Sequence, residues 1–266
     1  MIKVGISGAA GRMGQIIIRL LAKEKNMKLA AAIEARNHPM LGKDAGECAG
    51  TDRTGVVISS GTKNPGKIDV LIDFSSPQAA VEHMKQMAER KIPVVIGTTG
   101  LSPAQLQKIR RFSRKIPCVM APNMSVGVNL MFKLLKLAGR ILGKKYDVEI
   151  VEAHHRFKKD APSGTAKRMA EIIAEEAGLD LAKSGVYGRK GITGARKKGE
   201  LGIMSVRAGD IIGDHTVMFA GAGERLELTH RALSRDTFAR GAILAAMFAV
   251  RAKKGLHDMQ DVLGVK

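Results

Sequence analysis

The first 21 residues restrict the fold of this chain more than any other segment, because a strand, a glycine turn and a helix follow one another directly. The β-prone run of residues 2–7 leads into a turn with Gly8, Gly11 and Gly14. Such glycines let the backbone turn tightly and approach a pyrophosphate, and the helix that follows offers its N-terminal amides to phosphates. The spacing is GxxGxxG, a weaker match than GxGxxG. The segment predicts a dinucleotide-binding domain, with a nucleotide-free domain or another nucleotide as alternatives.

A second predicted strand, residues 29–33, ends at Glu34. This acid lies about 20 residues after the glycine turn, where a carboxylate accepts hydrogen bonds from the adenosine ribose of NAD. Ala35 comes next, and then Arg36, a cation suited to the extra phosphate of NADP. The sequence therefore leaves NADH and NADPH both open as cofactors, with NADH slightly favoured.

Three short apolar runs, at residues 69–74, 93–96 and 117–121, predict strands that are covered on both faces. Helical patterns follow the first two, which together with the N-terminal segment predicts a parallel sheet. Small and polar residues after the second and third runs are placed at the carboxyl edge of such a sheet, near a ribose or nicotinamide. These residues are Gly97, Thr98, Thr99, Pro122, Asn123 and Met124. Ordinary turn chemistry is the alternative interpretation.

The pattern changes from Tyr146 onward, where β-like runs follow one another with only short turns between them, at residues 201–206, 215–220 and 226–230. They predict a smaller α+β domain with a mixed, mainly antiparallel sheet. A final helical pattern at residues 237–252 is long enough to return to the first domain. We therefore expect an α/β protein with a Rossmann-type domain from residues 1–125 and 235–266 and a second domain from residues 126–234.

The stretch from Glu152 to Thr165 combines two histidines, several cations and a helix start. Residues 147–151 alternate like a half-buried strand, so His154 and His155 fall where a strand gives way to a loop. Ser163 opens a helix whose first amides, at Gly164 and Thr165, are suited to a carboxylate or phosphate. The stretch predicts a site for an anionic substrate. Alternatively, one histidine is in the core and the other is solvated, and Ser-Gly-Thr is only a cap.

The net charge of +19 favours anionic partners, such as nucleic acids or anionic ligands. The cations are scattered, aromatic residues make up 3% with no Trp, and no helix-turn-helix or zinc-finger spacing is evident, so we expect no nucleic-acid partner. The densest cationic cluster, residues 189–198, is interpreted as a mobile basic loop. The other histidines, among them His83 and His215, are isolated in the sequence.

Two cysteines, Cys48 and Cys118, exclude a disulfide framework and fit a reducing cytoplasm. Neither has metal-ligand spacing, so no metal is expected, and Cys118 lies in an apolar run typical of a buried thiol. No signal peptide or membrane-length apolar run is visible, so we expect a cytoplasmic protein with no membrane partner.

Several motifs together resemble the dihydrodipicolinate reductase family, also called 4-hydroxy-tetrahydrodipicolinate reductase, over nearly the full length. The most specific is EAHHRFKKDAPSGTA at residues 152–166. The others are GAAGRMG at 8–14, DFSSP at 73–77, GTTG at 97–100, APNMSVGVN at 121–129, VRAGDIIGDHTVMF at 206–219 and GERLELTHRA at 223–232.

The resemblance implies NAD(P)H-dependent reduction of 4-hydroxy-tetrahydrodipicolinate to tetrahydrodipicolinate, in the diaminopimelate route to lysine, by a homotetramer. It implies that His154 is the acid-base residue and Lys158 a second proton donor. Substrate contacts would come from His155, Ser163, Gly164 and Thr165. The cofactor would be lined by Gly8, Ala9, Ala10, Gly11, Arg12, Met13, Glu34, Arg36, Gly97, Thr98, Thr99, Ala121, Pro122, Asn123 and Met124.

Relatives in this family often carry Arg directly after the ribose-binding acid, where this chain has Ala35. That departure argues against a strong NADP preference. Two other functions compete with the reductase. One is a dehydrogenase for a polyol or an amino-acid semialdehyde, against which the cationic histidine cluster argues. The other is a nucleotide-sensing DNA-binding regulator, for which the sequence shows no motif that recognises DNA bases.

Overall fold

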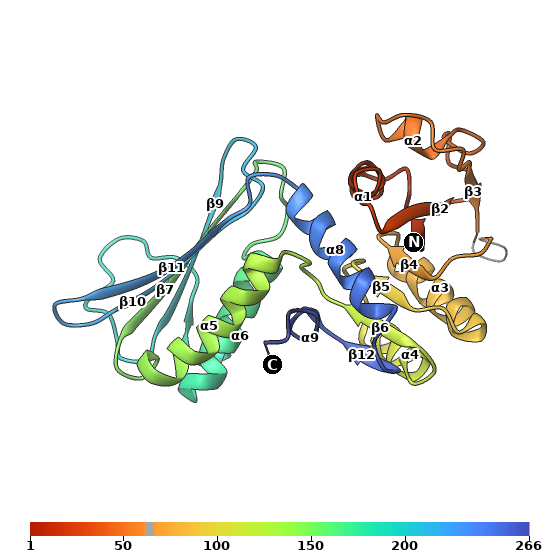
Figure 1. Ribbon diagram of the computed structural model, residues 1–266. Coiled ribbons are helices and arrows are strands. Elements are labelled where there is room, and N and C mark those ends of the chain that lie inside the picture. The colour runs from red at the N-terminus through yellow and green to blue at the C-terminus, as the bar shows by residue number, and fades with distance from the viewer. Residues whose placement is uncertain (62–65, 266) are drawn as a thin grey trace. The chain divides into compact units, whose positions relative to one another are not determined.

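The computed structural model describes residues 1–61 and 66–265, and the chain divides into two compact units (Figure 1). The first unit comprises Met1–Val126 and Arg235–Gly264, and the second comprises Gly127–Ser234. The first unit is therefore discontinuous in the sequence. Within the described ranges, no helix combines the length and the apolar character that crossing a bilayer requires.

The first unit is built on a seven-stranded sheet in the order β12-β6-β5-β4-β1-β2-β3, and all of its pairings are parallel. The strands are β1 (Ile2–Ser7), β2 (Met27–Glu34), β3 (Ile58–Ser60), β4 (Val70–Asp73), β5 (Val94–Ile96), β6 (Pro117–Met120) and β12 (Gly255–His257). The helices are α1 (Arg12–Leu21), α2 (Ala45–Cys48), α3 (Pro77–Arg90), α4 (Pro103–Ser113), α8 (Asp236–Ala249) and α9 (Met259–Leu263).

The strand order reverses between β1 and β4, since the chain runs outward in one direction through β2 and β3 and in the other through β5 and β6. Open α/β sheets bind their ligands outside the carboxyl ends of the strands at such a point. The loops after β1 and β4 therefore hold the position at which a ligand is expected.

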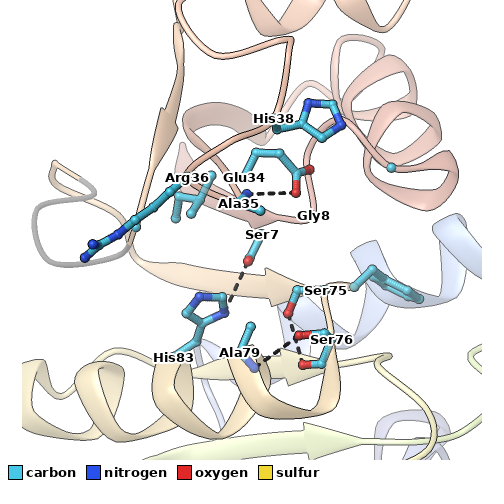
Figure 2. Close-up of a pocket in the computed structure, with 14 residues that line it drawn as sticks. Ser7, Gly8, Glu34, Ala35, Arg36, His38, Ser75, Ser76, Ala79 and His83 are labelled. Carbon is cyan, nitrogen blue, oxygen red and sulfur yellow. Dashed lines mark hydrogen bonds between the residues drawn. The ribbon is translucent and has the colours of Figure 1, made fainter.

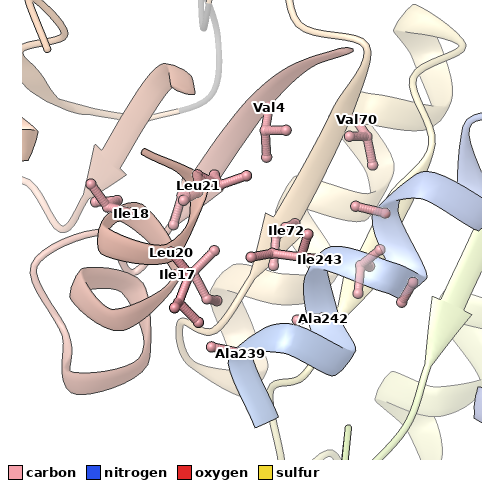
Figure 3. Close-up of a cluster of buried hydrophobic side chains, with 14 of the residues drawn as sticks. Val4, Ile17, Ile18, Leu20, Leu21, Val70, Ile72, Ala239, Ala242 and Ile243 are labelled. Carbon is pink, nitrogen blue, oxygen red and sulfur yellow. The ribbon is translucent and has the colours of Figure 1, made fainter. Parts of the chain in front are cut away.

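Helices cover both faces of this sheet. One face packs against α1 and α8, and the other packs against α3 and α4. Figure 3 shows the first layer, in which side chains of β1 and β4 meet those of the two helices: Val4, Val70, Ile72, Ile17, Ile18, Leu20, Leu21, Ala239, Ala242 and Ile243. Because successive strand residues point to opposite faces, Leu71 belongs to the other layer. Helix α8 thus completes a core that begins at β1.

The second unit has a five-stranded mixed sheet in the order β11-β10-β7-β9-β8. Its strands are β7 (Asp147–His154), β8 (Gly185–Val186), β9 (Leu201–Arg207), β10 (Asp214–Ala220) and β11 (Arg225–Arg231). Strand β10 pairs antiparallel with β7 and β11, whereas β9 pairs parallel with β7 and β8. Two helices, α5 (Val126–Leu142) and α6 (Gly164–Ala177), pack on one face, and the short α7 (Leu181–Ser184) follows.

The predicted fold class, a parallel Rossmann-type sheet plus a second mixed-sheet domain, is confirmed. Cys118 is buried, which confirms the predicted buried thiol, and burial raises the pKa of this thiol to about 12. The predicted basic loop at residues 189–198 is mostly exposed, and its mobility stays a prediction. Arg189 and Arg196 each bind the Glu149 carboxylate of β7, so two of these cations are held against the sheet by opposite charge.

Candidate active site

In the glycine turn after β1, neighbouring backbone atoms leave no room for a side chain at Gly8 or Gly14. Gly8 has a φ of +75°, and a Cβ built there would lie 2.3 Å from the Phe74 carbonyl oxygen. A Cβ at Gly14 would lie 2.1 Å from the Gly8 carbonyl oxygen. Both neighbours are backbone atoms, which cannot move aside without shifting β1 or α1. The turn therefore requires glycine at these two positions, because backbone approaches backbone closely there.

Helix α1 begins at Arg12 without a side-chain cap and has no acidic residue in its first turn. The helices α3, α4 and α6, in contrast, are each capped by a serine hydroxyl, from Ser76, Ser102 and Ser163. An uncapped helix start at the carboxyl edge of a parallel sheet presents N–H groups and the positive end of the helix dipole to an anion. This arrangement suits the pyrophosphate of a dinucleotide.

A cavity of about 400 Å³ lies at the reversal point of the strand order (Figure 2). It is lined from the ends of β1, β2 and β4 and from α3, by Ser7, Gly8, Gly11, Ile33, Glu34, Ala35, Arg36, His38, Gly61, Phe74, Ser75, Ser76, Ala79 and His83. Of the predicted cofactor residues it contains Gly8, Gly11, Glu34 and Arg36. The Glu34 carboxylate accepts hydrogen bonds from the backbone N–H groups of Ala10 (3.0 Å) and Ala35 (2.9 Å), so the acid is already oriented.

A fully buried carboxylate, Asp73, organises the wall of this cavity at the end of β4. One of its oxygens accepts from the Ser75 hydroxyl at 2.7 Å and from the Thr98 hydroxyl at 2.8 Å. The other lies 2.6 Å from Nδ1 of His83, which also lies 3.2 Å from the Ser7 hydroxyl. No role was predicted for Asp73 or His83, because their contact depends on how α3 packs against the sheet.

The remaining predicted cofactor residues lie at the carboxyl edge of the sheet, in the loops after β1, β5 and β6 and in the first turn of α1. None of them lines the cavity: Ala9, Ala10, Arg12, Met13, Gly97, Thr98, Thr99, Ala121, Pro122, Asn123 and Met124. The side chain of Met124 is 2% exposed within the core, and the Thr98 hydroxyl is bound to Asp73. At these two positions, the side chain is therefore not available to a ligand.

In the second unit, the end of β7 carries His154 on the face that packs against the helices. The residues Val148, Ile150, Glu152 and His154 alternate as the buried side of this strand. Nδ1 of His154 lies 2.5 Å from the Glu152 carboxylate. A carboxylate in this place fixes the ring's orientation and leaves Nε2 for proton exchange. His155, the next residue, follows the end of β7 and is half-buried.

His215 on β10 lies beside this pair, although it looked isolated in the sequence. Its ring meets that of His154 edge-on at 5.2 Å, and its Nε2 lies 3.1 Å from the Ser163 hydroxyl. Burial, together with the charge of His154, lowers the pKa of His215 to about 3, so it is neutral at physiological pH. Ser163 itself caps α6, since its hydroxyl accepts from the Ala166 N–H.

The loop between β7 and α6 brings a cation close to the same strand end. The Lys158 ammonium lies 2.8 Å from the Asp160 carboxylate. That hydrogen bond holds the pKa of Asp160 below its usual range. The side chain of Lys158 is mostly buried, with 20% of its surface exposed to solvent, whereas the neighbouring Lys159 is exposed. At the start of α6, Gly164 is exposed and Thr165 half-buried. The predicted substrate residues thus form one group within the second unit.

Comparison with known proteins covers both units. Residues 2–124 match the profile "Dihydrodipicolinate reductase, N-terminus", and residues 127–263 match "Dihydrodipicolinate reductase, C-terminus". The chain is 54% identical to the 4-hydroxy-tetrahydrodipicolinate reductase of Syntrophus aciditrophicus and 51% identical to that of Syntrophotalea carbinolica, over 100% of each pair of chains.

Among solved structures, a dipicolinate-bound dihydrodipicolinate reductase from Paenisporosarcina sp. TG-14 is 27% identical with a TM-score of 0.75, covering 98% of each chain. A myo-inositol dehydrogenase from Corynebacterium glutamicum ATCC 13032 shares the fold at 15% identity, with a TM-score of 0.60 and coverage of 100% of this chain and 93% of that one. The fold is thus common to several dehydrogenases, whereas the two profiles and the full-length relatives are specific. The chain belongs to the dihydrodipicolinate reductase family.

Proposed function

We propose that this protein uses a nicotinamide cofactor to reduce 4-hydroxy-tetrahydrodipicolinate to tetrahydrodipicolinate. The observation that carries the proposal is the arrangement of side chains at the end of β7 in the second unit, in a chain that belongs to this family. There His154 is paired with a buried carboxylate, close in sequence to Lys158 and the start of α6. An acid-base imidazole among cations suits an anionic ring that must gain a proton.

The first unit fits the phosphates and ribose of a dinucleotide. The uncapped start of α1 and the glycine turn would hold the pyrophosphate, and Glu34 would accept hydrogen bonds from the ribose hydroxyls. When bound, the nicotinamide supplies the hydride that reduces the substrate. The predicted loops after β5 and β6 remain part of this proposal as cofactor contacts.

The second unit would bind and protonate the substrate. Hydride addition to a conjugated imine leaves electron density on a neighbouring carbon, and His154 would deliver a proton there from Nε2. Lys158 would exchange its bond with Asp160 for a substrate carboxylate and act as a second proton donor. His155, Ser163, Gly164 and Thr165 would hold the substrate's carboxylates.

The first test follows NADH and NADPH oxidation at 340 nm while a synthase forms the heterocycle in place from pyruvate and aspartate semialdehyde. We expect rapid oxidation that depends on both precursors. Tight NADH binding with no oxidation of either cofactor would remove the proposed substrate and favour another anionic one.

Cofactor preference is expected to depend on Ala35, which lines the cavity between Glu34 and Arg36. In Ala35→Arg, an added guanidinium can pair with the extra phosphate of NADPH, and one charge-assisted hydrogen bond is worth about 1.5 kcal/mol. We therefore expect the ratio of kcat/KM for NADPH over NADH to rise about tenfold. Ala35→Met, which has similar length and no charge, is the control. An equal change in both variants would show that charge is not the cause.

We further propose that the protein acts in the cytoplasm, in the diaminopimelate route to lysine, as a homotetramer. The sheet face opposite α5 and α6 supports assembly, because it carries half-buried Val151, Met204 and Met218 and the 44% exposed Val206. Light scattering should give about four times the 28.5 kDa chain mass. Growth of a reductase-deficient strain without diaminopimelate, once it carries this chain, tests the pathway.

A further inference from the structure

Glu152 is an acidic residue at a position where the alternation of β7 places side chains in the core. It follows Val148 and Ile150 on the buried side of β7, and its side chain is 0% exposed. A buried ionised carboxylate costs several kcal/mol unless it is paired and hydrogen-bonded. The hydrogen bonds and ion pair that compensate for this cost therefore indicate the role of Glu152.

Each carboxylate oxygen of Glu152 accepts hydrogen bonds from two donors among Ser163, His154 and Arg207. Oε1 accepts from the Ser163 N–H at 3.1 Å and from Nη2 of Arg207 at 2.8 Å. Oε2 accepts from Nδ1 of His154 at 2.5 Å and from Nη1 of Arg207 at 2.8 Å. Although burial opposes ionisation, the bonds from His154, Arg207 and Ser163, with one from Ser205, hold the pKa of Glu152 well below its usual range. The group is therefore an anion that only accepts.

An acceptor-only partner determines which ring nitrogen of His154 carries a proton. Nδ1 must be protonated to donate to Glu152, so Nε2 is the nitrogen that gains and loses a proton. Space beside Nε2 is kept by a glycine, since a Cβ at Gly213 would lie 3.1 Å from it. The neutral His215, edge-on to the same ring, adds no competing charge.

The same carboxylate holds the start of α6. Its bond to the Ser163 N–H fixes the residue whose hydroxyl caps the helix and contacts His215. Arg207, from the end of β9, also donates to the Asp160 carbonyl oxygen at 2.6 Å, which ties down the loop that carries Lys158. The Glu152–Arg207 ion pair thus joins His154, Ser163 and the loop that carries Lys158.

We propose that Glu152, held by Arg207, is the positioning residue of this site: it keeps His154 protonated at Nδ1 and sets the first turn of α6. This inference rests on the proposed reductase function for its kinetic consequence. Glu152 does not itself touch the substrate. It acts through His154 and Ser163.

Glu152→Gln is the sharpest test, because an amide has one oxygen where the site needs two acceptors. Whichever way the amide turns, its NH2 faces an Arg207 N–H and either Ser163 or His154. Only His154 can adapt, by moving its proton from Nδ1 to Nε2. The imidazolium, with protons on both nitrogens, then cannot form without breaking the new bond.

We expect Glu152→Gln to lower kcat about 100-fold, the scale of a lost acid-base group, with the substrate KM changed less than threefold and NADH affinity unchanged. The 15N shifts of the His154 imidazole should show Nδ1 protonated in the native protein and Nε2 protonated in the variant. Glu149→Gln is the matched control. Glu149 lies on the other face of β7 and also binds two arginines, so its loss should change neither kcat nor the tautomer.

Arg207→Lys keeps the proposal testable if Glu152→Gln does not fold. An ammonium cannot bridge both carboxylate oxygens, so kcat should fall about tenfold while the charge balance is kept. Native kcat and an unchanged His154 tautomer in whichever variant folds would overturn the positioning role. If the native protein reduces no substrate, the proposed function fails, and the tautomer comparison still decides the role of Glu152.

Discussion

His154→Ala is expected to lower turnover of 4-hydroxy-tetrahydrodipicolinate by at least about 100-fold, because the variant lacks the proposed proton donor. Lys158→Ala should lose a similar factor, since it removes both a substrate cation and a second donor. Both substitutions are in the second unit, so NADH affinity should stay native. Steady-state kinetics at 340 nm and NADH fluorescence titration measure the two quantities separately.

Lys159→Ala is the control for the lysine, because Lys159 is adjacent and exposed to solvent. It should retain native turnover within a factor of two to three. Near-native turnover in both His154→Ala and Lys158→Ala would remove the proposed roles. A parallel loss in Lys159→Ala would instead indicate a general effect of loop charge.

Gly14→Ala is expected to damage the cofactor unit by the addition of a single methyl group. The new Cβ would lie 2.1 Å from the Gly8 carbonyl oxygen and 2.7 Å from Cα of Ala9, both of them backbone. Relief requires α1 to move away from β1, which costs on the order of 1–3 kcal/mol of folding free energy. The same movement displaces the helix start proposed to bind phosphate, so NADH affinity should fall at least tenfold, a loss of about 1.4 kcal/mol.

Chemical denaturation and NADH titration test this pair of effects. The control is Gly164→Ala, where an added Cβ meets no atom within 4 Å, so stability and NADH affinity should both stay close to native. Native NADH affinity in Gly14→Ala would contradict the proposed phosphate site, even if stability fell as expected.

Local pattern was sufficient to predict most of the fold. The glycine turn, the short apolar strands and the returning helix at residues 237–252 correspond to β1–α1, the central strands and α8. Helix α5 was missed, although Val128, Phe132 and Leu135 are buried at helical spacing. Its other face also carries apolar residues, such as Leu134 and Leu137, which obscures the periodicity. Strand β12 has only three residues, too few for a period to appear.

The candidate site was predictable where it is contiguous and not where it is assembled from distant segments. His154, Lys158 and Ser163 lie within one motif, whereas Arg207 and His215 reach them only through the register of β9 and β10. Glu152 did leave a signal in the sequence. A charged residue two positions after Ile150 falls in the buried phase of an alternating strand, where an acid requires partners. Asp73 left no comparable signal, because it ends a continuous apolar run.

The discontinuity of the first unit has a consequence during translation. At ~5–20 residues per second, the ribosome takes roughly 5–20 s to make the segment 127–234 that separates α8 from β6. Throughout that interval the nascent first sheet lacks the helix whose Ala239, Ala242 and Ile243 cover its core. The second unit has a continuous segment, so all of its helices and strands are synthesised before α8. The fold of the second unit therefore does not depend on α8, whereas the first unit can close its core only after α8 has been made.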